Sequence, residues 1–183
     1  MGLHTWWLDD PAQRYWMEIT HRPDEDIGTN LWCPVRDVWS DQLASWVRPG
    51  DQVLHWKAWE ADREPSLVGW SKAMQEPRVI ADDHDYYDDG DYYDDDSDSS
   101  PDTWFVVLDG LRRFRRPVSS SSLLAEIDQL MDVKAALEDA YGKPIYFPFI
   151  RYRRRELRAQ QGYLTKFPAE LFEVIPGIRS ASR

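Results

Sequence analysis

The sequence has one cysteine and no long apolar run, and both absences limit where the protein works. Cys33 alone cannot form an internal disulfide, which agrees with a reducing compartment. No stretch approaches the roughly 18 apolar residues that a membrane-spanning helix needs. The N-terminal residues also lack the basic and apolar regions of a signal peptide. We therefore expect a cytoplasmic protein that does not enter a membrane.

Patterns that mark catalytic sites are missing as well. The histidines, at positions 4, 21, 55 and 84, have no His-Cys or His-Glu spacing suited to zinc. There is no phosphate-binding glycine loop, no nucleophile elbow and no carboxylate pair that can be assigned to acid/base work. Nothing in the sequence would activate the Cys33 thiol as a nucleophile. We expect a chain that binds without catalysis and uses neither a metal nor a cofactor.

Aromatic residues are abundant: ten Trp, nine Tyr and six Phe make up 14% of the chain. This is more flat ring surface than a core of this size needs, so part of it should face a ligand. Several tryptophans have polar neighbours at the edges of expected strands, and Trp32 stands between an amide and a proline. Flat apolar walls hold a nucleobase by stacking, while a few polar groups read its edge.

Charge is distributed unevenly. The net charge is −11, but the segment Asp82–Asp102 holds eleven aspartates and no lysine or arginine, and the rest of the chain is balanced. This insertion is interpreted as a solvated loop, with a calcium loop or a mimic of phosphates as alternatives. The net charge therefore does not exclude a polyanionic partner.

Arginines gather in the second half of the chain. Four lie between Leu111 and Arg116, and five lie in the eight residues from Arg151 to Arg158. Arginines interleaved with aromatic residues favour phosphate contact. The candidate phosphate-binding residues are Arg112, Arg113, Arg115, Arg151, Arg153, Arg154 and Arg155.

Hydrophobic periodicity indicates a single α+β domain spanning residues 1–183. Strands are predicted at 15–20, 52–59, 66–73 and 103–108, and helices at 39–47, 123–141 and 168–175. The second and third strands read as a hairpin. Gly69 inside the third strand predicts a bulge or a close approach of two backbones. This order suggests a small curved or closed sheet with helices around it.

An ordered series of short motifs resembles EVE domains, which are relatives of YTH and SRA domains in the PUA-like superfamily. The series consists of Tyr15–Thr20, Asn30–Pro34, Val47–Asp51, Leu67–Ser71 and Gln161–Leu164. The resemblance implies a small β-barrel flanked by helices, with a pocket for a modified base. In bacteria, such domains are often N-terminal readers of modification-dependent restriction endonucleases, followed by an HNH nuclease or a motor domain. These readers recognise modified cytosine, commonly after base flipping.

The resemblance also suggests roles for single residues. Trp32 is similar to the cage tryptophan of YTH domains, Cys33 takes the small position after it, and Thr20 and His21 resemble the edge-reading segment. Trp104 follows the Leu67–Gly69 strand as the second cage wall does. The late acidic residue of YTH pockets has no match, because arginines occupy that region. The candidate pocket residues are Trp32, Trp104, Trp56, Trp70, Thr20, His21, Asn30, Cys33 and Ser71.

Three hypotheses follow. The first is a reader of 5-methyl- or 5-hydroxymethylcytosine in double-stranded DNA, which serves as the targeting module of a modification-dependent restriction endonuclease whose nuclease domain lies beyond this chain. The second is a YTH-type RNA-binding module that recognises N6-methyladenine in an aromatic cage. The third is a protein-interaction scaffold in which every tryptophan belongs to the core.

Overall fold

The computed structural model describes residues 5–58, 63–81, 102–153, 156–175 and 177–179. Nearly all of the acidic insertion at 82–102 lies outside the described residues, and so do Arg154 and Arg155.

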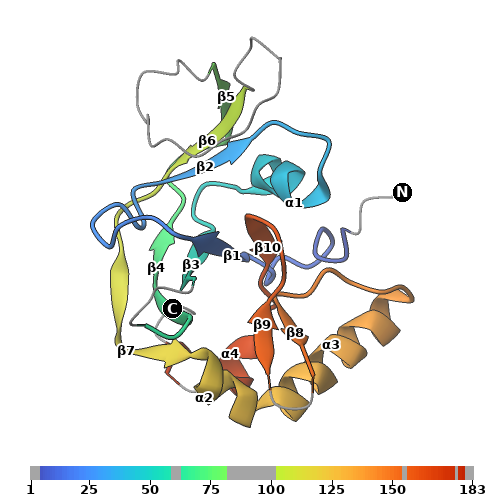
Figure 1. The fold of residues 1–183 in the computed structure, drawn as a ribbon. Coiled ribbons are helices and arrows are strands. Elements are labelled where there is room, and N and C mark those ends of the chain that lie inside the picture. Colours follow the sequence, from blue (N-terminus) through green and yellow to red (C-terminus); the bar gives the residue numbers. More distant parts are fainter. Residues whose placement is uncertain (1–4, 59–62, 82–101, 154–155, 176, 180–183) are drawn as a thin grey trace, which may run out of the picture.

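The main sheet has five strands in the order β10-β1-β3-β4-β7 (Figure 1). They are β1 (Tyr15–Thr20), β3 (Gln52–Lys57), β4 (Ser66–Lys72), β7 (Arg112–Ser119) and β10 (Leu164–Lys166). β1 and β3 run parallel, and the other neighbours are antiparallel. The hairpin of β3 and β4 and the strand at 15–20 are confirmed. Successive side chains of these strands point to opposite faces, and β3 is buried along its whole length because both faces of the sheet are covered.

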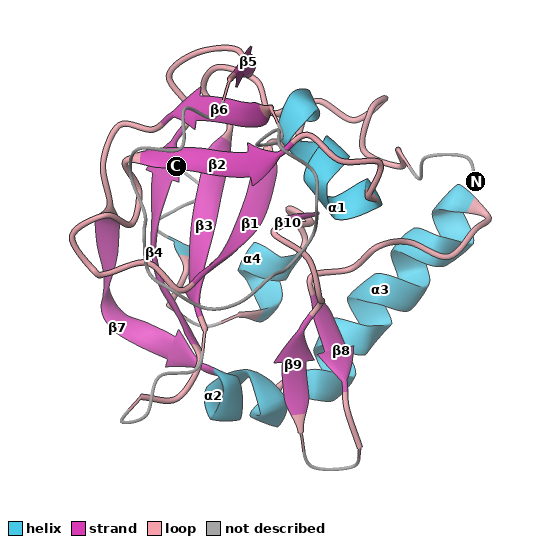
Figure 2. Cartoon of the chain, turned by 45° about the horizontal axis from the view of Figure 1, so that its top comes forward, coloured by secondary structure: helices cyan, strands magenta, loops and turns pink. Residues whose placement is uncertain are grey.

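A second sheet crosses over the first in Figure 2 and has the order β2-β6-β5. Its strands are β2 (Asn30–Pro34), β6 (Thr103–Val107) and β5 (Arg78–Ile80). The sequence predicted the strand at 103–108 but gave no strand at Asn30–Pro34. The five residues of β2 are extended because they pair with β6, a segment far along the chain. Local sequence does not reveal such a partner.

Backbone hydrogen bonds join the two sheets on one side only. Met74 N–H donates to Val107 O over 2.9 Å, and Asp109 N–H donates to Lys72 O over 3.0 Å. On the other side, the free edge of β2 faces the β1–β10 pair, and no backbone ladder connects them within the described residues. The strands therefore enclose an interior as a barrel does, but one side stays open. This opening, between β2 and the β1–β10 pair, is called the seam below.

The helices of the second half of the chain cover the main sheet on the face away from β2, whereas the helical segment at 39–46 lies beside β2 (Figure 1). The helix expected at 39–47 is confirmed as α1 (Trp39–Gln42) followed by the 3-10 helix η1 (Leu43–Trp46). The helix expected at 123–141 is two helices, α2 (Ser120–Ala125) and α3 (Ile127–Tyr141), which meet at Glu126. The other elements are α4 (Leu171–Val174), β8 (Phe149–Arg151) and β9 (Leu157–Ala159).

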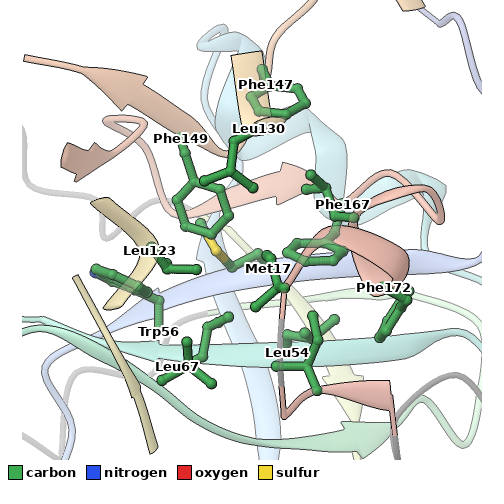
Figure 3. Close-up of a cluster of buried hydrophobic side chains, with 14 of the residues drawn as sticks. Met17, Leu54, Trp56, Leu67, Leu123, Leu130, Phe147, Phe149, Phe167 and Phe172 are labelled. Atoms are coloured by element: carbon green, nitrogen blue, oxygen red, sulfur yellow. The ribbon is translucent and has the colours of Figure 1, made fainter. Parts of the chain in front are cut away.

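Two apolar cores follow from this layering. The inner core lies between the two sheets and includes Trp16, Leu31 and Val106. The outer core lies between the main sheet and the helices, and Figure 3 shows Met17, Leu54 and Phe167 among its members. Residues of β1 alternate between these cores, because successive side chains of a strand point to opposite faces.

Gly69 marks a close backbone approach, as the sequence predicted. A Cβ at this position would lie 2.4 Å from Arg112 O and 2.9 Å from the Arg113 Cα, and the β4–β7 register shifts beside it. Because backbone atoms cannot move aside cheaply, Gly69→Ala is expected to destabilise the protein by roughly 3 kcal/mol. Gly142→Ala is the control, because a Cβ at Gly142 would have no atom within 4 Å. This variant should lose only about 1 kcal/mol of stability, since alanine is disfavoured in the left-handed conformation of this residue. Thermal unfolding of both variants measures the difference, and equal costs would contradict it.

Candidate nucleic-acid interface

Side chains close the seam where the backbone does not. The Tyr163 hydroxyl accepts a hydrogen bond from Trp32 N–H over 2.8 Å, and Arg22 Nη2 donates to Asn30 O over 3.0 Å. Both are backbone groups at the free edge of β2. No neighbouring strand supplies their hydrogen-bond partners there, so side chains do. The position of β2, and therefore of Trp32, depends on Tyr163 and Arg22.

Both of these side chains are held by one buried carboxylate. Glu18 lies on the inner face of β1 with no exposed surface. It accepts hydrogen bonds from Arg22 Nη2 over 2.6 Å and from the Tyr163 hydroxyl over 2.7 Å. Burial alone would raise the pKa of Glu18, but the His55 hydrogen bond and charge, then Arg22 and Tyr163, outweigh it and lower the pKa. Glu18 is therefore a stable anion at the centre of the seam.

The same carboxylate continues inward to a histidine and a serine. Glu18 Oε2 lies 2.7 Å from His55 Nδ1, and His55 Nε2 lies 2.7 Å from Ser71 Oγ. The order Ser-His-Glu is that of a catalytic triad, but all three residues have no exposed surface. Because an ionised Glu18 can only accept, the hydrogen of this contact lies on His55 Nδ1. This geometry supports a role in holding Glu18 in place.

Trp32 presents an open ring beside the seam. Its exposed fraction is 41%, and its ring meets that of Phe105 edge-to-face at 6.0 Å. The Arg78 guanidinium lies 5.1 Å from the centre of the Phe105 ring. The register of the second sheet explains this row, because Trp32 pairs with Phe105 and Phe105 with Arg78. These three residues are called the aromatic platform.

Trp104 does not face Trp32. It pairs with Cys33, so both project to the other face of the second sheet, where they pack against the inner core. Burial, and then the neighbouring Asp41, raise the pKa of the Cys33 thiol, which agrees with a small neutral neighbour rather than a nucleophile. The partner of Trp32 is Phe105, which the sequence analysis did not single out. Strict alternation along Thr103–Val107 was the signal that could have found it.

Two further predicted pocket residues contact Arg22. Asn30 Oδ1 accepts from Arg22 Nη1 over 3.0 Å, and the Thr20 hydroxyl accepts from Arg22 N–H over 3.2 Å. His21 is exposed at the end of β1. Ser71, by contrast, lies deep in the interior with His55. Arg22, Glu18 and Tyr163 were missed because a charged side chain in a strand gives no sign of its partner across the fold.

The remaining tryptophans lie away from the platform. Trp56 and Trp70 both belong to the outer core, and the Arg112 guanidinium stacks on the Trp70 ring at 4.6 Å. Trp56 also lines a hollow of about 730 Å³ that opens beside His21 and Tyr163, on the face of β1 opposite to the platform. This hollow brings His21 and Trp56 together.

Cations surround the loop that follows β1. Asp24 lies 3.3 Å from Arg63, 3.5 Å from Arg113 and 3.5 Å from Lys57, and Lys57 also donates to Arg22 O. Arg63 and Arg113 expose 64% and 52% of their side chains. Arg63 and Arg113 therefore present partly exposed guanidinium groups beside this loop, whereas Lys57 is buried. Arg63 and Lys57 were not predicted.

The other predicted phosphate contacts are more scattered. Arg112 forms a two-pronged ion pair with Asp109, at 2.8 and 2.6 Å, and Arg151 pairs with Asp128. Arg115 is exposed on β7, and Arg153 lies in the turn between β8 and β9 with a φ of 60°. Arg154 and Arg155 lie outside the described residues.

Two crossed sheets with helices on the outer face of the main sheet, and a polar seam beside an exposed tryptophan, define an α+β fold built as a half-open barrel. No family model matches the chain, and no curated protein matches it. Within the described residues, no helix is long and apolar enough to cross a membrane.

The chain is similar to several solved structures, and the first of the following supports the fold. The N-terminal domain of McrB from Staphylothermus marinus has a TM-score of 0.51 at 14% identity, over 89% of this chain and 93% of that one. A protein from Pseudomonas syringae has a TM-score of 0.49 at 14% identity, over 88% and 96%. Human THYN1, solved in complex with 5-methylcytosine-containing DNA, has a TM-score of 0.41 at 14% identity, over 80% and 90%. Sequence identities this low support statements about the fold alone. The ligand has to be argued from the residues of the site.

Proposed function

We propose that this domain is a reader of modified DNA that recognises 5-methyl- or 5-hydroxymethylcytosine by base flipping. The observation that carries the proposal is Trp32, which is exposed on a strand whose edge is held by Tyr163 and Arg22. A flat ring at the surface can stack on a base, and here the strand that carries the ring is held in place before a ligand arrives. A flipped cytosine would stack on the free face of Trp32.

The groups around Arg22 supply edge contacts for such a base. Asn30 Oδ1 already accepts from Arg22, so its amide NH₂ group remains available to donate to an acceptor of cytosine. His21 lies in the hollow beside Trp56 and does not belong to this group. Arg63 and Arg113 would then contact the phosphates flanking the flipped nucleotide, since their side chains are half exposed beside the seam.

Cytosine is favoured over N6-methyladenine by two features of the site. A methyladenine cage needs two facing aromatic walls, and Trp104 lies on the opposite face of its sheet from Trp32. The chain also has arginines where YTH domains place a late acidic residue. RNA containing N6-methyladenine remains the second candidate, because the sequence resembles YTH domains around Trp32.

We further propose that the chain is itself non-catalytic and targets a nuclease domain of a modification-dependent restriction endonuclease. Support comes from the burial of the Ser71–His55–Glu18 row, which leaves its serine inaccessible. Cleavage assays with this chain alone should give no product on methylated duplex, and any cleavage that is lost in Ser71→Ala would contradict this part.

A binding panel tests the function directly. Fluorescence anisotropy would compare otherwise identical duplexes carrying cytosine, 5-methylcytosine or 5-hydroxymethylcytosine, together with single-stranded RNA carrying adenine or N6-methyladenine. We expect tighter binding to at least one modified duplex than to the plain duplex, with quenching of tryptophan fluorescence. Preference for methylated RNA would favour the second candidate, and no binding or quenching would favour a protein-interaction scaffold.

Arg113→Ala is expected to weaken binding to plain and modified duplexes by the same factor and to reduce the slope of log K against log salt by about one. Arg113 is the test residue because Asp24 keeps Arg63 and Lys57 as partners in the variant. The control is Lys134→Ala, on α3 at the other side of the molecule in Figure 1. This variant also removes one positive charge, but at a position where no contact with DNA is predicted. A loss confined to the modified duplex would assign Arg113 to base reading instead.

A further inference from the structure

A cavity of about 530 Å³ lies at the start of β1, at the opposite end of that strand from the seam. Three tryptophans line it: Trp7 from the N-terminal segment, Trp16 from β1 and Trp46 from η1. Trp7 and Trp16 are buried and meet edge-to-face at 5.7 Å. The walls therefore offer flat apolar surface to a ring-shaped ligand.

Lys166, the last residue of β10, also lines this cavity. Only 2% of the residue is exposed, and its Nζ lies 3.9 Å from the centre of the Trp16 ring and 5.7 Å from that of Trp7. Within the part of the chain that the structure describes, no carboxylate or carbonyl oxygen accepts a hydrogen bond from this amine. A buried lysine without an acceptor is rare, because lysines are almost never fully buried unless paired.

The charged neighbours of Lys166 explain why it lacks a partner. Asp51 is the buried carboxylate of the cavity, and its oxygens accept from Arg14 Nε over 2.8 Å, Trp16 Nε1 over 2.9 Å and Arg48 N–H over 3.0 Å. Burial lowers the pKa of Lys166 to about 7; Asp51 opposes this, and Arg14 and Arg48 add to it. Three exposed carboxylates complete the lining at its rim: Asp9, Asp10 and Glu76.

We propose that this cavity binds a small planar aromatic carboxylate, with the acid group paired to the ammonium of Lys166 and the ring against the tryptophan walls. An incoming carboxylate supplies the acceptor that Lys166 lacks, and Arg48 adds a second positive charge. The rim carboxylates oppose ligands of higher negative charge, so a phosphate dianion is disfavoured. The site is separate from the seam and does not depend on DNA binding.

Isothermal titration calorimetry with benzoate tests the proposal on the full chain. Binding is expected at about pH 6 and at least about tenfold weaker at about pH 9, because the carboxylate pairs only with the protonated amine. Near pH 7 the complex should take up protons, seen as a dependence of the heat on the buffer used. Benzamide, the neutral analogue, and phenyl phosphate, the phosphate analogue, should both bind more weakly. Equal affinity for benzoate and benzamide, or no binding of benzoate, would overturn the proposal.

Lys166→Met retains the apolar stem and removes the amine, and it is expected to lose benzoate binding by about tenfold or more. Lys143→Met is the matched control, since Lys143 is exposed and lies outside the cavity. Trp32→Ala should bind benzoate as the wild type does, which separates this site from the seam. Unchanged binding in Lys166→Met would overturn the assignment.

Lys166→Met should also fold, which keeps the test decisive. In the unfolded chain the lysine holds its proton up to about pH 10.5, whereas in the folded chain it loses the proton near pH 7. Wild-type stability therefore rises with pH across this window. The variant should have a higher Tm than wild type at neutral pH, with a gap that shrinks toward pH 10. If the variant fails to fold, Trp46→Ala is the second test, and retained affinity there would overturn the proposal.

Discussion

Trp32→Ala is expected to abolish the preference for modified over plain duplex while leaving the fold intact. Stacking of one base on an aromatic ring is worth roughly 1–3 kcal/mol, so affinity for the modified duplex should fall by about ten- to a hundredfold, to the level of the plain duplex. Stability should hardly change, because 41% of Trp32 is exposed and its backbone N–H keeps Tyr163 as partner. Anisotropy with both duplexes measures the effect.

Two controls define what Trp32 contributes. Trp32→Phe keeps a flat ring and should retain most of the discrimination. Met74→Ala removes another exposed apolar side chain, 57% exposed and outside the aromatic platform, and should change nothing. If Trp32→Ala retained full discrimination, the base would have to enter elsewhere, and the hollow lined by His21 and Trp56 would be the next site to test.

Glu18→Ala is expected to produce the largest loss of stability. It leaves Arg22, Tyr163 and His55 without their shared acceptor in a buried site. Removing one partner from a buried ion pair costs roughly 3–5 kcal/mol. For a chain of this length each kcal/mol lowers Tm by about 2–4 °C, so a drop of roughly 10 °C or more is expected in calorimetry. The seam should loosen too, and modified-duplex affinity should fall with it.

Glu18→Gln separates the charge from the hydrogen bonds. The glutamine oxygen can still accept from Arg22 and Tyr163, and its NH₂ group can donate to His55 Nδ1 if the histidine moves its proton to Nε2 and donates to Ser71. Only the ion pair with Arg22 is lost, so the cost should be nearer 1–2 kcal/mol. Glu25→Ala, an exposed carboxylate, should cost less than about 0.5 kcal/mol. A Glu18→Ala protein as stable as Glu25→Ala would contradict the account of the seam.

The pH dependence of the wild type provides a further check on Glu18. Its folded pKa lies below the ordinary value of 4.5, so its stabilisation is fully present above that value and is lost as pH falls through the folded pKa. The difference in unfolding free energy between wild type and Glu18→Gln should therefore shrink below about pH 4.5. A difference that stays constant down to low pH would mean that Glu18 titrates normally.

Strands and helices with strong internal patterns could be predicted from the sequence. β1, β3, β4 and β6 each carry enough large apolar side chains to be recognised, and the helix at 123–141 needed only a break at Glu126. β2 could not be predicted in this way. Its residues alternate too briefly, and its extended form comes from pairing with β6, beyond the acidic insertion.

The candidate site divides in the same way. Trp32, Asn30, Thr20 and His21 were predicted, and the structure joins Asn30 and Thr20 through Arg22, whereas His21 lies in the hollow with Trp56. Trp104, Trp56 and Trp70 were grouped with them because all are tryptophans near strand edges. The direction of each side chain distinguishes these three tryptophans from Trp32. That direction follows from how the strands pair, and the sequence of one strand alone does not reveal the pairing.

Residue order along the chain was sufficient to indicate an α+β domain and to point to Trp32, because motif spacing and aromatic content are local properties. Folding alone decided that Glu18, Arg22 and Tyr163 meet at the seam, since Tyr163 comes from the far end of the chain. Folding alone also decided that Lys166 lies buried against Trp16 without an acceptor. Burial and pairing of charges are properties of the packed molecule, because each depends on side chains that only the tertiary structure brings into contact.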